Sequence, residues 1–132
     1  MRAVDTNVLV RVIVQDDPRQ TDAAKLFVQS GIWVSTLVLA ETVWVLESNY
    51  GHGRREIDQA VGMMLDLPNV ILQDADAVRG ALELFRARPG IDFSDCLILA
   101  LARNAGHLPL GTFDRALSRV TGTELLGRQW RD

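Results

Sequence analysis

The alternation of short apolar runs with longer helical patterns constrains the fold of this sequence most. The short runs lie at residues 3–4, 32–35, 69–73 and 108–112 and predict strands, with a possible edge strand at 124–126. Between them we expect helices at residues 18–28, 36–50, 57–65, 78–85, 92–104 and 115–120. At residues 8–14 the apolar run alone does not distinguish helix from strand, and we expect a helix because a strand directly after the first strand would leave Asp5 in a hairpin. A strand followed by a helix along a whole chain predicts an α/β fold of three layers, with a mainly parallel central sheet flanked by helices.

Length and composition narrow the class of protein further. The chain has 132 residues, the common size of one domain, so we expect a single domain over residues 1–132. Its net charge of −3 indicates no general affinity for nucleic acid, and its lone cysteine, Cys96, excludes an internal disulfide. Because no apolar stretch is long enough to cross a membrane and no leader opens the chain, we expect a cytoplasmic protein without a membrane partner.

Four acidic residues stand at similar places relative to the predicted elements. Asp5 follows the first strand, Glu41 lies in the helix after the second strand, and Asp114 follows the fourth strand. Asp95 lies in the first turn of its own helix. Parallel strands have their carboxyl ends at one edge of a sheet, so we expect the four carboxylates to converge there.

Four converging carboxylates predict a metal site. At close range they repel one another, and a hard divalent cation with oxygen ligands relieves that repulsion, which indicates one or two Mg²⁺ or Mn²⁺ ions. Such a site turns a bound water into a nucleophile and stabilises the leaving oxygen of a phosphoryl displacement. We therefore predict hydrolysis of a phosphodiester.

Three of the four acids also have a structural role open to them. Asp5 suits a turn, and Asp114 suits the N-cap of the last helix. Asp95 suits the third position of a capping box begun by Asp92. Glu41 differs, because it lies among apolar residues in mid-helix and its helix contains no lysine or arginine. We expect it to have little water around it and to need a partner.

Four short motifs carry these acids, and together they resemble a known family. They read Val-Asp5-Thr-Asn7-Val-Leu-Val, Leu39-Ala-Glu41-Thr-Val, Asp92-Phe-Ser-Asp95-Cys-Leu-Ile-Leu-Ala-Leu-Ala and Gly111-Thr112-Phe-Asp114-Arg. In order and spacing they resemble the four acidic motifs of PIN-domain nucleases, with the closest likeness to the VapC toxins of bacterial toxin–antitoxin pairs. The resemblance spans the chain from Asp5 to about Arg119.

The resemblance implies a Mg²⁺- or Mn²⁺-dependent endoribonuclease that acts on RNA. Its catalytic and metal-binding carboxylates map to Asp5, Glu41, Asp95 and Asp114. Asn7 matches the polar residue that helps orient the first acid, and Thr112 matches the small hydroxyl position of the last motif. The resemblance also implies a homodimer that is silenced by a cognate antitoxin protein, whose apolar segment lies across a groove. We look for that groove at the helices of residues 8–14 and 23–28.

Two neighbouring acids compete for the third metal-ligand position. Asp92 and Asp95 lie three residues apart, at the start of the same predicted helix. We expect Asp92 to be the N-cap, with its carboxylate bonded to the backbone N–H of Asp95, and Asp95 to be the ligand. Asp92 is then a supporting residue of the site.

Three arginines near the predicted acids are candidates for contacts with RNA. They are Arg86, Arg88 and Arg115. Arginines suit phosphate contacts because their planar fork donates two parallel hydrogen bonds. Solvated arginines at helix ends are the alternative.

Rival interpretations of the acids fit less well. A receiver domain has a similar size and Mg²⁺-binding acids, but it needs a lysine after a late strand, and the lone Lys25 lies in the second predicted helix. A haloacid-type phosphatase has a second aspartate where this chain has Asn7. A PIN-like module that binds RNA or a protein without cleaving is expected to lack one of the acids, and all four are present.

Overall fold

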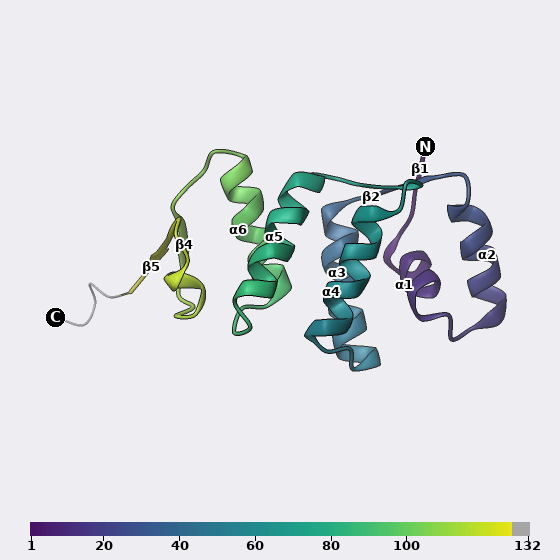
Figure 1. Cartoon of the computed structure of the whole chain (residues 1–132), viewed down its shortest axis with the longest axis horizontal. Helices are drawn as coiled ribbons and strands as arrows, with labels where there is room; N and C mark the ends of the chain where they lie inside the picture. Colours follow the sequence, from purple (N-terminus) through teal and green to yellow (C-terminus); the bar gives the residue numbers. More distant parts are fainter. Residues whose placement is uncertain (128–132) are drawn as a thin grey trace. The chain divides into compact units, whose positions relative to one another are not determined.

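The computed structural model describes residues 1–127, which form two compact units, Met1–Ala75 and the part of the chain from Asp76 onward. Over the described residues the chain folds into six α-helices, one 3₁₀ helix and five short strands (Figure 1). Every strand pair in this range is parallel. The α/β class with parallel strands, predicted from the alternation of elements, is therefore confirmed.

The first unit is built on a three-stranded sheet. Its strands are β1 (Arg2–Ala3), β2 (Ile32–Val34) and β3 (Val70–Leu72), paired in the order β1-β2-β3. The helices of this unit are α1 (Thr6–Val14), α2 (Pro18–Val28), α3 (Thr36–Tyr50) and α4 (Arg54–Asp66). Because the strands are parallel, the chain leaves all three at the same edge of the sheet. At that edge Ser35 and Gln73 directly follow β2 and β3, and Asp5 lies two residues after β1.

Aspartates begin the first two helices. Asp5 Oδ1 accepts a hydrogen bond from the Val8 N–H at 3.1 Å, at the N-cap of α1. Asp17 Oδ1 accepts one from the Gln20 N–H at 3.2 Å, and Pro18 occupies the first position of α2. An N-cap side chain satisfies a backbone donor that the helix itself leaves without a partner. The predicted start of the second helix at Asp17-Pro18 is confirmed.

Two side chains from different strand ends hold the start of α3. Ser35 Oγ accepts a hydrogen bond from the Val38 N–H at 3.1 Å. Gln73 Oε1 accepts one from the Thr36 N–H at 2.9 Å, so the residue after β3 fixes the helix that follows β2. At the other end, Gly51 has a φ of +65°, a left-handed conformation that ends the helix.

The core of the first unit forms where one face of each helix meets the sheet. α3 buries the stripe Leu39, Thr42, Val43 and Leu46, which recurs at helical spacing. The other fully or nearly fully buried apolar residues include Leu9, Val10, Ile32, Val34, Ile57, Val61 and Met64. Burying one such side chain stabilises a fold by about 1.5–3 kcal/mol. Apolar packing therefore holds these strands of two and three residues in place.

The second unit consists of two helices and a two-stranded sheet. The helices are α5 (Ala75–Ala87) and α6 (Phe93–Asn104), and the strands are β4 (Leu110–Thr112) and β5 (Thr123–Leu125). The rings of Phe85 and Phe93 meet edge to face with centroids 5.7 Å apart. Both rings are buried, and Cys96 is also fully buried. The apolar faces of the two helices thus form the core of this unit.

The last predicted helix is shorter than expected. Instead of a helix over residues 115–120, the chain forms a single 3₁₀ turn, η1 (Leu117–Arg119). Thr123 Oγ1 donates to the Val120 carbonyl at 2.7 Å, and Gly122 turns the chain with a φ of +94°. The turn ends early because the chain must reverse into β5, which confirms the edge strand one residue before its predicted start.

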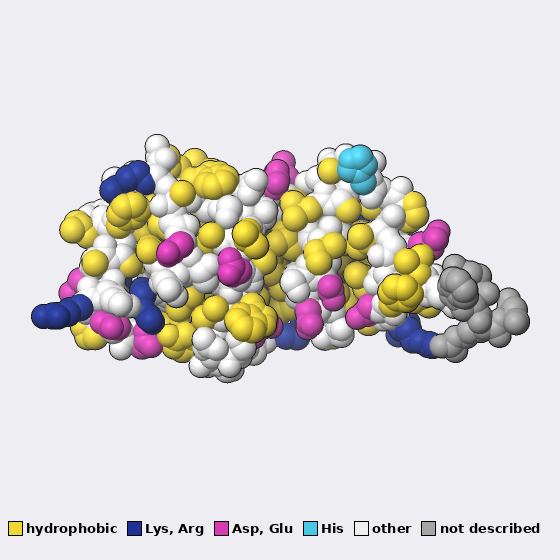
Figure 2. Space-filling view, turned by 180° about the vertical axis from the view of Figure 1, so that it is seen from behind, with side chains coloured by type: hydrophobic (Ala, Val, Ile, Leu, Met, Phe, Trp, Pro, Cys, Tyr) yellow, Lys and Arg dark blue, Asp and Glu magenta, His cyan; other side chains and the backbone are white. Residues whose placement is uncertain are grey.

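The surface shows mixed character. On the face seen in Figure 2, apolar side chains are widespread, acidic side chains are scattered among them, and basic side chains are sparse. Within residues 1–127, no helix is both long and apolar enough to span a membrane.

Candidate active site

Asp5 lies where the sequence predicts, two residues after the end of β1. Val4 is buried, whereas Asp5 is exposed, with Oδ1 bonded to the Val8 N–H at the start of α1. Asp5 therefore has a structural role, but as the N-cap of α1 with an extended backbone and not as the turn residue that the sequence suggests. Asn7 is exposed in the first turn of the same helix.

The structure contradicts the expectation that Glu41 is shielded from water. Glu41 is exposed, and so are its helical neighbours Leu37 and Trp44, at 69% and 65%. An apolar helix still buries only the stripe that faces the core, which on α3 runs through Leu39 and Val43. Glu41 lies outside that stripe, so the prediction from apolar surroundings was wrong.

The second unit brings three acids under each other's electrostatic influence. Asp92 lies at the N-cap of α6, Asp95 in its first turn, and Asp114 after β4. Partial burial raises the pKa of Asp95 above its ordinary value of 3.8, and repulsion from Asp114 and then Asp92 raises it further. The folded chain therefore binds a proton on Asp95 more readily than a fully solvated aspartate does.

The expected capping bond of Asp92 is absent. The backbone of Asp92 is extended, as the N-cap position requires, but its side chain makes no capping hydrogen bond. The prediction that its carboxylate is bonded to the Asp95 N–H was wrong. One consistent reason is charge, because a carboxylate turned toward that N–H also approaches the carboxylate of Asp95.

Asp114 and Thr112 form a small hydrogen-bonded unit. The Asp114 N–H donates to Thr112 Oγ1 at 3.0 Å, and Asp114 Oδ1 accepts from the Leu117 N–H at 2.9 Å. The second bond ties Asp114 to the first residue of η1, but the N-cap of that turn is Ala116 and not Asp114 as the sequence suggests. Thr112 thus orients the backbone of the acid that follows it.

The three candidate RNA-binding arginines are exposed. Arg86 lies in the last turn of α5, Arg88 lies just after that helix, and Arg115 directly follows Asp114. Exposure of this kind is compatible with phosphate contacts and equally with solvated arginines at helix ends.

The donor set is suited to a hard cation, although neither unit contains a complete ligand cluster. Among residues 1–127, no three Asp, Glu, His or Cys side chains gather closely enough to hold a metal ion. In the second unit, however, Asp95 is already destabilised in its charged form by two neighbouring carboxylates. Carboxylate oxygens are the ligands that Mg²⁺ and Mn²⁺ prefer, so the residues present fit such an ion.

A pocket of about 440 Å³ lies between α1 and α2 in the first unit. Its polar lining comes from Asp5, Asn7, Arg11 and Gln20. Its apolar lining comes from Val8, Ala23, Ala24 and Phe27. The pocket therefore joins the first predicted catalytic acid to the groove expected between these two helices.

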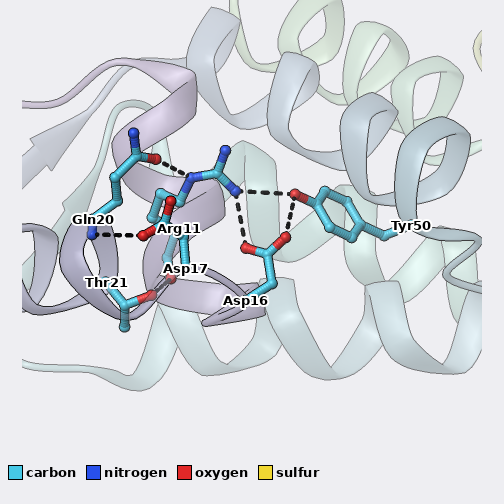
Figure 3. A network of polar contacts seen from close by, with 6 residues as sticks. All are labelled: Arg11, Asp16, Asp17, Gln20, Thr21 and Tyr50. Carbon is cyan, nitrogen blue, oxygen red and sulfur yellow. Dashed lines mark hydrogen bonds and ion pairs between the residues drawn. The ribbon is translucent and has the colours of Figure 1, made fainter.

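A polar network that the sequence analysis missed borders this pocket (Figure 3). Arg11 Nη1 donates to Asp16 Oδ1 and to the Tyr50 hydroxyl, each at 3.0 Å, and Arg11 Nε donates to Gln20 Oε1. The Tyr50 hydroxyl in turn donates to Asp16 Oδ2 at 3.1 Å. The bond with Tyr50 is the main cause that raises the pKa of Arg11, so this guanidinium stays charged.

The sequence does contain a signal for this network. Arg11 is the single charged residue in the apolar segment that forms α1. A charge on an otherwise apolar helix needs partners, and the acid nearest after the helix is Asp16. Tyr50, 39 residues away, has no such signal.

Parallel strands, intervening helices and carboxylates at helix starts define an α/β protein with an acidic candidate site. A family model described as the PIN domain matches residues 2–122, and the chain belongs to the PIN domain family. Its motifs resemble those of the nucleases in this family, so nuclease is its general class.

Other comparisons add little. Among solved structures, the chain is similar to the VapC20 toxin of Mycobacterium tuberculosis, described as cleaving the sarcin–ricin loop. The two share 23% sequence identity, the match covers 95% of this chain and 98% of that chain, and the TM-score is 0.44. A likeness at this score is too weak to assign a function. A comparison with curated proteins finds no match.

Proposed function

We propose that the chain is a Mg²⁺- or Mn²⁺-dependent endoribonuclease and the toxin of a toxin–antitoxin pair, acting as one nuclease domain over residues 1–132. Membership of the PIN domain family supports the nuclease class. The order and spacing of the four acidic motifs support the finer assignment, because all four acids of the pattern are present in the sequence.

The proposed metal ligands and catalytic acids are Asp5, Glu41, Asp95 and Asp114. The observation that carries the proposal is the match to the PIN domain family over residues 2–122, together with the four acidic motifs in the sequence. Partial burial and two neighbouring carboxylates raise the pKa of Asp95, which supports the proposal for the second unit. A fold that keeps such an unfavourable cluster gains from a positive ligand. When bound, Mg²⁺ or Mn²⁺ supplies a water nucleophile at neutral pH and neutralises charge on the phosphate.

The protein residues contribute orientation and proton binding. Asp95 holds a proton more readily than a solvated aspartate, so protons compete for this ligand as the pH falls. Asp5 is oriented by its bond to the Val8 N–H, which leaves Oδ2 for other contacts. Thr112 Oγ1 accepts a hydrogen bond from the Asp114 N–H and so orients the backbone of that acid. Asn7 and Asp92 are supporting residues next to the proposed ligands.

The proposed partners are RNA, a cognate antitoxin and a second copy of the chain. The pocket between α1 and α2 lies where the family resemblance puts the antitoxin groove, and its apolar wall suits an apolar segment. The proposal that the chain forms a homodimer rests on the family resemblance. Arg86, Arg88 and Arg115 are the proposed RNA contacts, supported by their exposure and their position near the acids in the sequence.

A cleavage assay tests the proposal. The purified chain is incubated with mixed cellular RNA in Mg²⁺, in Mn²⁺ and in excess chelator, and the products are separated by size. We expect cleavage only with a divalent ion. Full activity in chelator contradicts the metal dependence. Tight RNA binding without cleavage under any condition favours the alternative of a PIN-like binding module.

A further inference from the structure

Arg11 carries a pair of hydrogen-bond donors that its protein partners leave unused. Arginine has five N–H donors, one on Nε and two on each Nη. Nε and Nη1 donate to Gln20, Asp16 and Tyr50. Within residues 1–127, no acceptor is recorded for the two hydrogens of Nη2. In Figure 3 this nitrogen points away from Asp16 and Tyr50.

The surrounding contacts hold the guanidinium group in a fixed orientation. Partners come from α2, from the turn before it and from the end of α3, so three segments restrain one side chain. A side chain that is ordered before a ligand arrives loses less conformational entropy on binding. The Arg11 side chain is 26% exposed, so a ligand in the pocket can still reach it. These features suit a binding residue better than a solvated arginine.

Arg11 lies close enough to the proposed catalytic acid Asp5 to contact the same RNA strand. Arg11 and Asp5 line the same pocket. At a rise of about 1.5 Å per residue, Arg11 lies roughly 9 Å from Asp5 along α1. That separation is too large for both residues to contact one phosphate oxygen, but a nucleic-acid strand at Asp5 carries further phosphates on either side.

We infer that Arg11 binds a backbone phosphate of the RNA substrate through Nη2, next to the phosphodiester that is cleaved. The inference rests on the proposed nuclease function and adds a contact that neither the motifs nor the candidate arginines predict. The apolar wall of the pocket, which includes Val8 and Phe27, accommodates the attached nucleoside. An acidic side chain of a protein partner is the other possible anion. RNA is favoured because its strand must pass Asp5 for the reaction to occur.

The test measures how RNA binding depends on salt. Binding of a fluorescent single-stranded RNA is followed by anisotropy with Ca²⁺ in place of Mg²⁺, and a gel checks that the RNA stays intact. Arg11→Met should weaken binding roughly tenfold, as expected for loss of one charge-assisted contact. It should also reduce the slope of log K against log salt by about 0.7, the value for one phosphate contact on a single strand.

Two control variants separate this contact from a structural effect. Arg79→Met removes an exposed arginine of α5 that has only a 3.8 Å ion pair with Asp76, and the salt slope should not change. Tyr50→Phe removes one partner of Nη1 but leaves Nη2 intact, so the slope should also hold. An unchanged slope in folded Arg11→Met, while the parent chain cleaves RNA, overturns the inference. Loss of antitoxin binding with an unchanged slope assigns the contact to a protein partner and also overturns it.

A second pair of variants decides the matter if Arg11→Met fails to fold. Asp16→Asn removes the negative charge that compensates Arg11, whereas Asp22→Asn removes an equal charge from an exposed site on α2. RNA binding should be tighter in Asp16→Asn than in Asp22→Asn. Equal or weaker binding overturns the inference. If the parent chain neither binds nor cleaves RNA, the proposed function itself has failed.

Discussion

The two units hold their candidate acids in different ways. In the first unit, Asp5 is engaged in capping α1, and Glu41 lies exposed on α3. In the second unit, Asp95 is half-buried and is repelled by Asp114 and Asp92. One pair of acids is therefore compatible with a stable fold without any ligand, whereas the other group carries an unfavourable interaction.

This difference shows that a carboxylate can serve the fold and a ligand at once. A capping aspartate such as Asp5 has a second oxygen available, so its structural role does not exclude metal binding. The mutually repelling acids of the second unit contribute less to the stability of the fold. Asp92 makes no capping hydrogen bond, and Asp95 becomes harder to ionise. The electrostatic indication of a cation site thus comes from the second unit.

The largest expected effect is the loss of RNA cleavage when a candidate acid of either unit is replaced. Asp5→Asn and Asp95→Asn should each reduce the cleavage rate by more than about 100-fold, because removing even a residue behind a metal ligand costs about 10- to 100-fold. Asp22→Asn is the matched control for loss of one negative charge. Gel assays with saturating Mg²⁺ and circular dichroism spectra check rate and folding. If a folded variant keeps nearly the activity of the parent chain, the replaced acid is not part of the catalytic site.

The next effect is stabilisation by Mg²⁺. A ligand that binds only the folded chain stabilises it by about 2.7 kcal/mol at 100 times its dissociation constant. We expect Mg²⁺ to raise the melting temperature of the parent chain and of Asp22→Asn, and to have much less effect on Asp95→Asn. Thermal unfolding with and without Mg²⁺ measures this. Equal shifts in all three chains place the bound ion away from Asp95.

Helix caps give a smaller contrast between the units. Asp5→Ala should cost about 1 kcal/mol of unfolding free energy because α1 loses its capping bond, whereas Asp5→Asn should cost little. Asp92→Ala should cost well under half of that amount, since no capping bond exists to lose. Urea unfolding in chelator measures all three. A loss of about 1 kcal/mol in Asp92→Ala means that this residue caps α6 in solution after all.

The smallest expected effect is a pH dependence of stability at Asp95. Because its folded pKa is raised, its favourable contribution is complete below the unfolded value of 3.8 and disappears as the pH rises through the folded value. Asp95→Asn cannot ionise, so it should gain stability relative to the parent chain as the pH rises through this window. Urea unfolding in chelator at successive pH values tests the sign. A relative gain that grows toward acid contradicts the assignment.

Local signals made much of the fold predictable. The long helix α3 was predicted with its observed ends, because a long segment without breakers runs from Thr36 to Tyr50 and Gly51 closes it. Asp17 and Pro18 marked the start of α2 for an equally local reason. The final turn was less predictable, because a chain reversal at Gly122 competes with helix formation there.

The membership of the candidate site stays a prediction. Asp5, Asp95 and Asp114 were singled out by their places after strands or at a helix start, and the four acids occur in an order that resembles the PIN motifs. Their joint action in one site stays a prediction. The environment of Glu41 was predicted wrongly because apolar residues on a helix do not reveal which face is buried.

The sequence by itself determined the order of elements, the start of α2 at Asp17 and Pro18 and the positions of the acidic motifs, because these depend on residues within about one turn of each other. Tertiary structure decided which side of α3 is buried and how strongly Asp95 is repelled by Asp114. It also joined Arg11 to Tyr50 across 39 residues. Burial and long-range pairing arise only when separate elements pack together, so a pattern read along one segment cannot contain them.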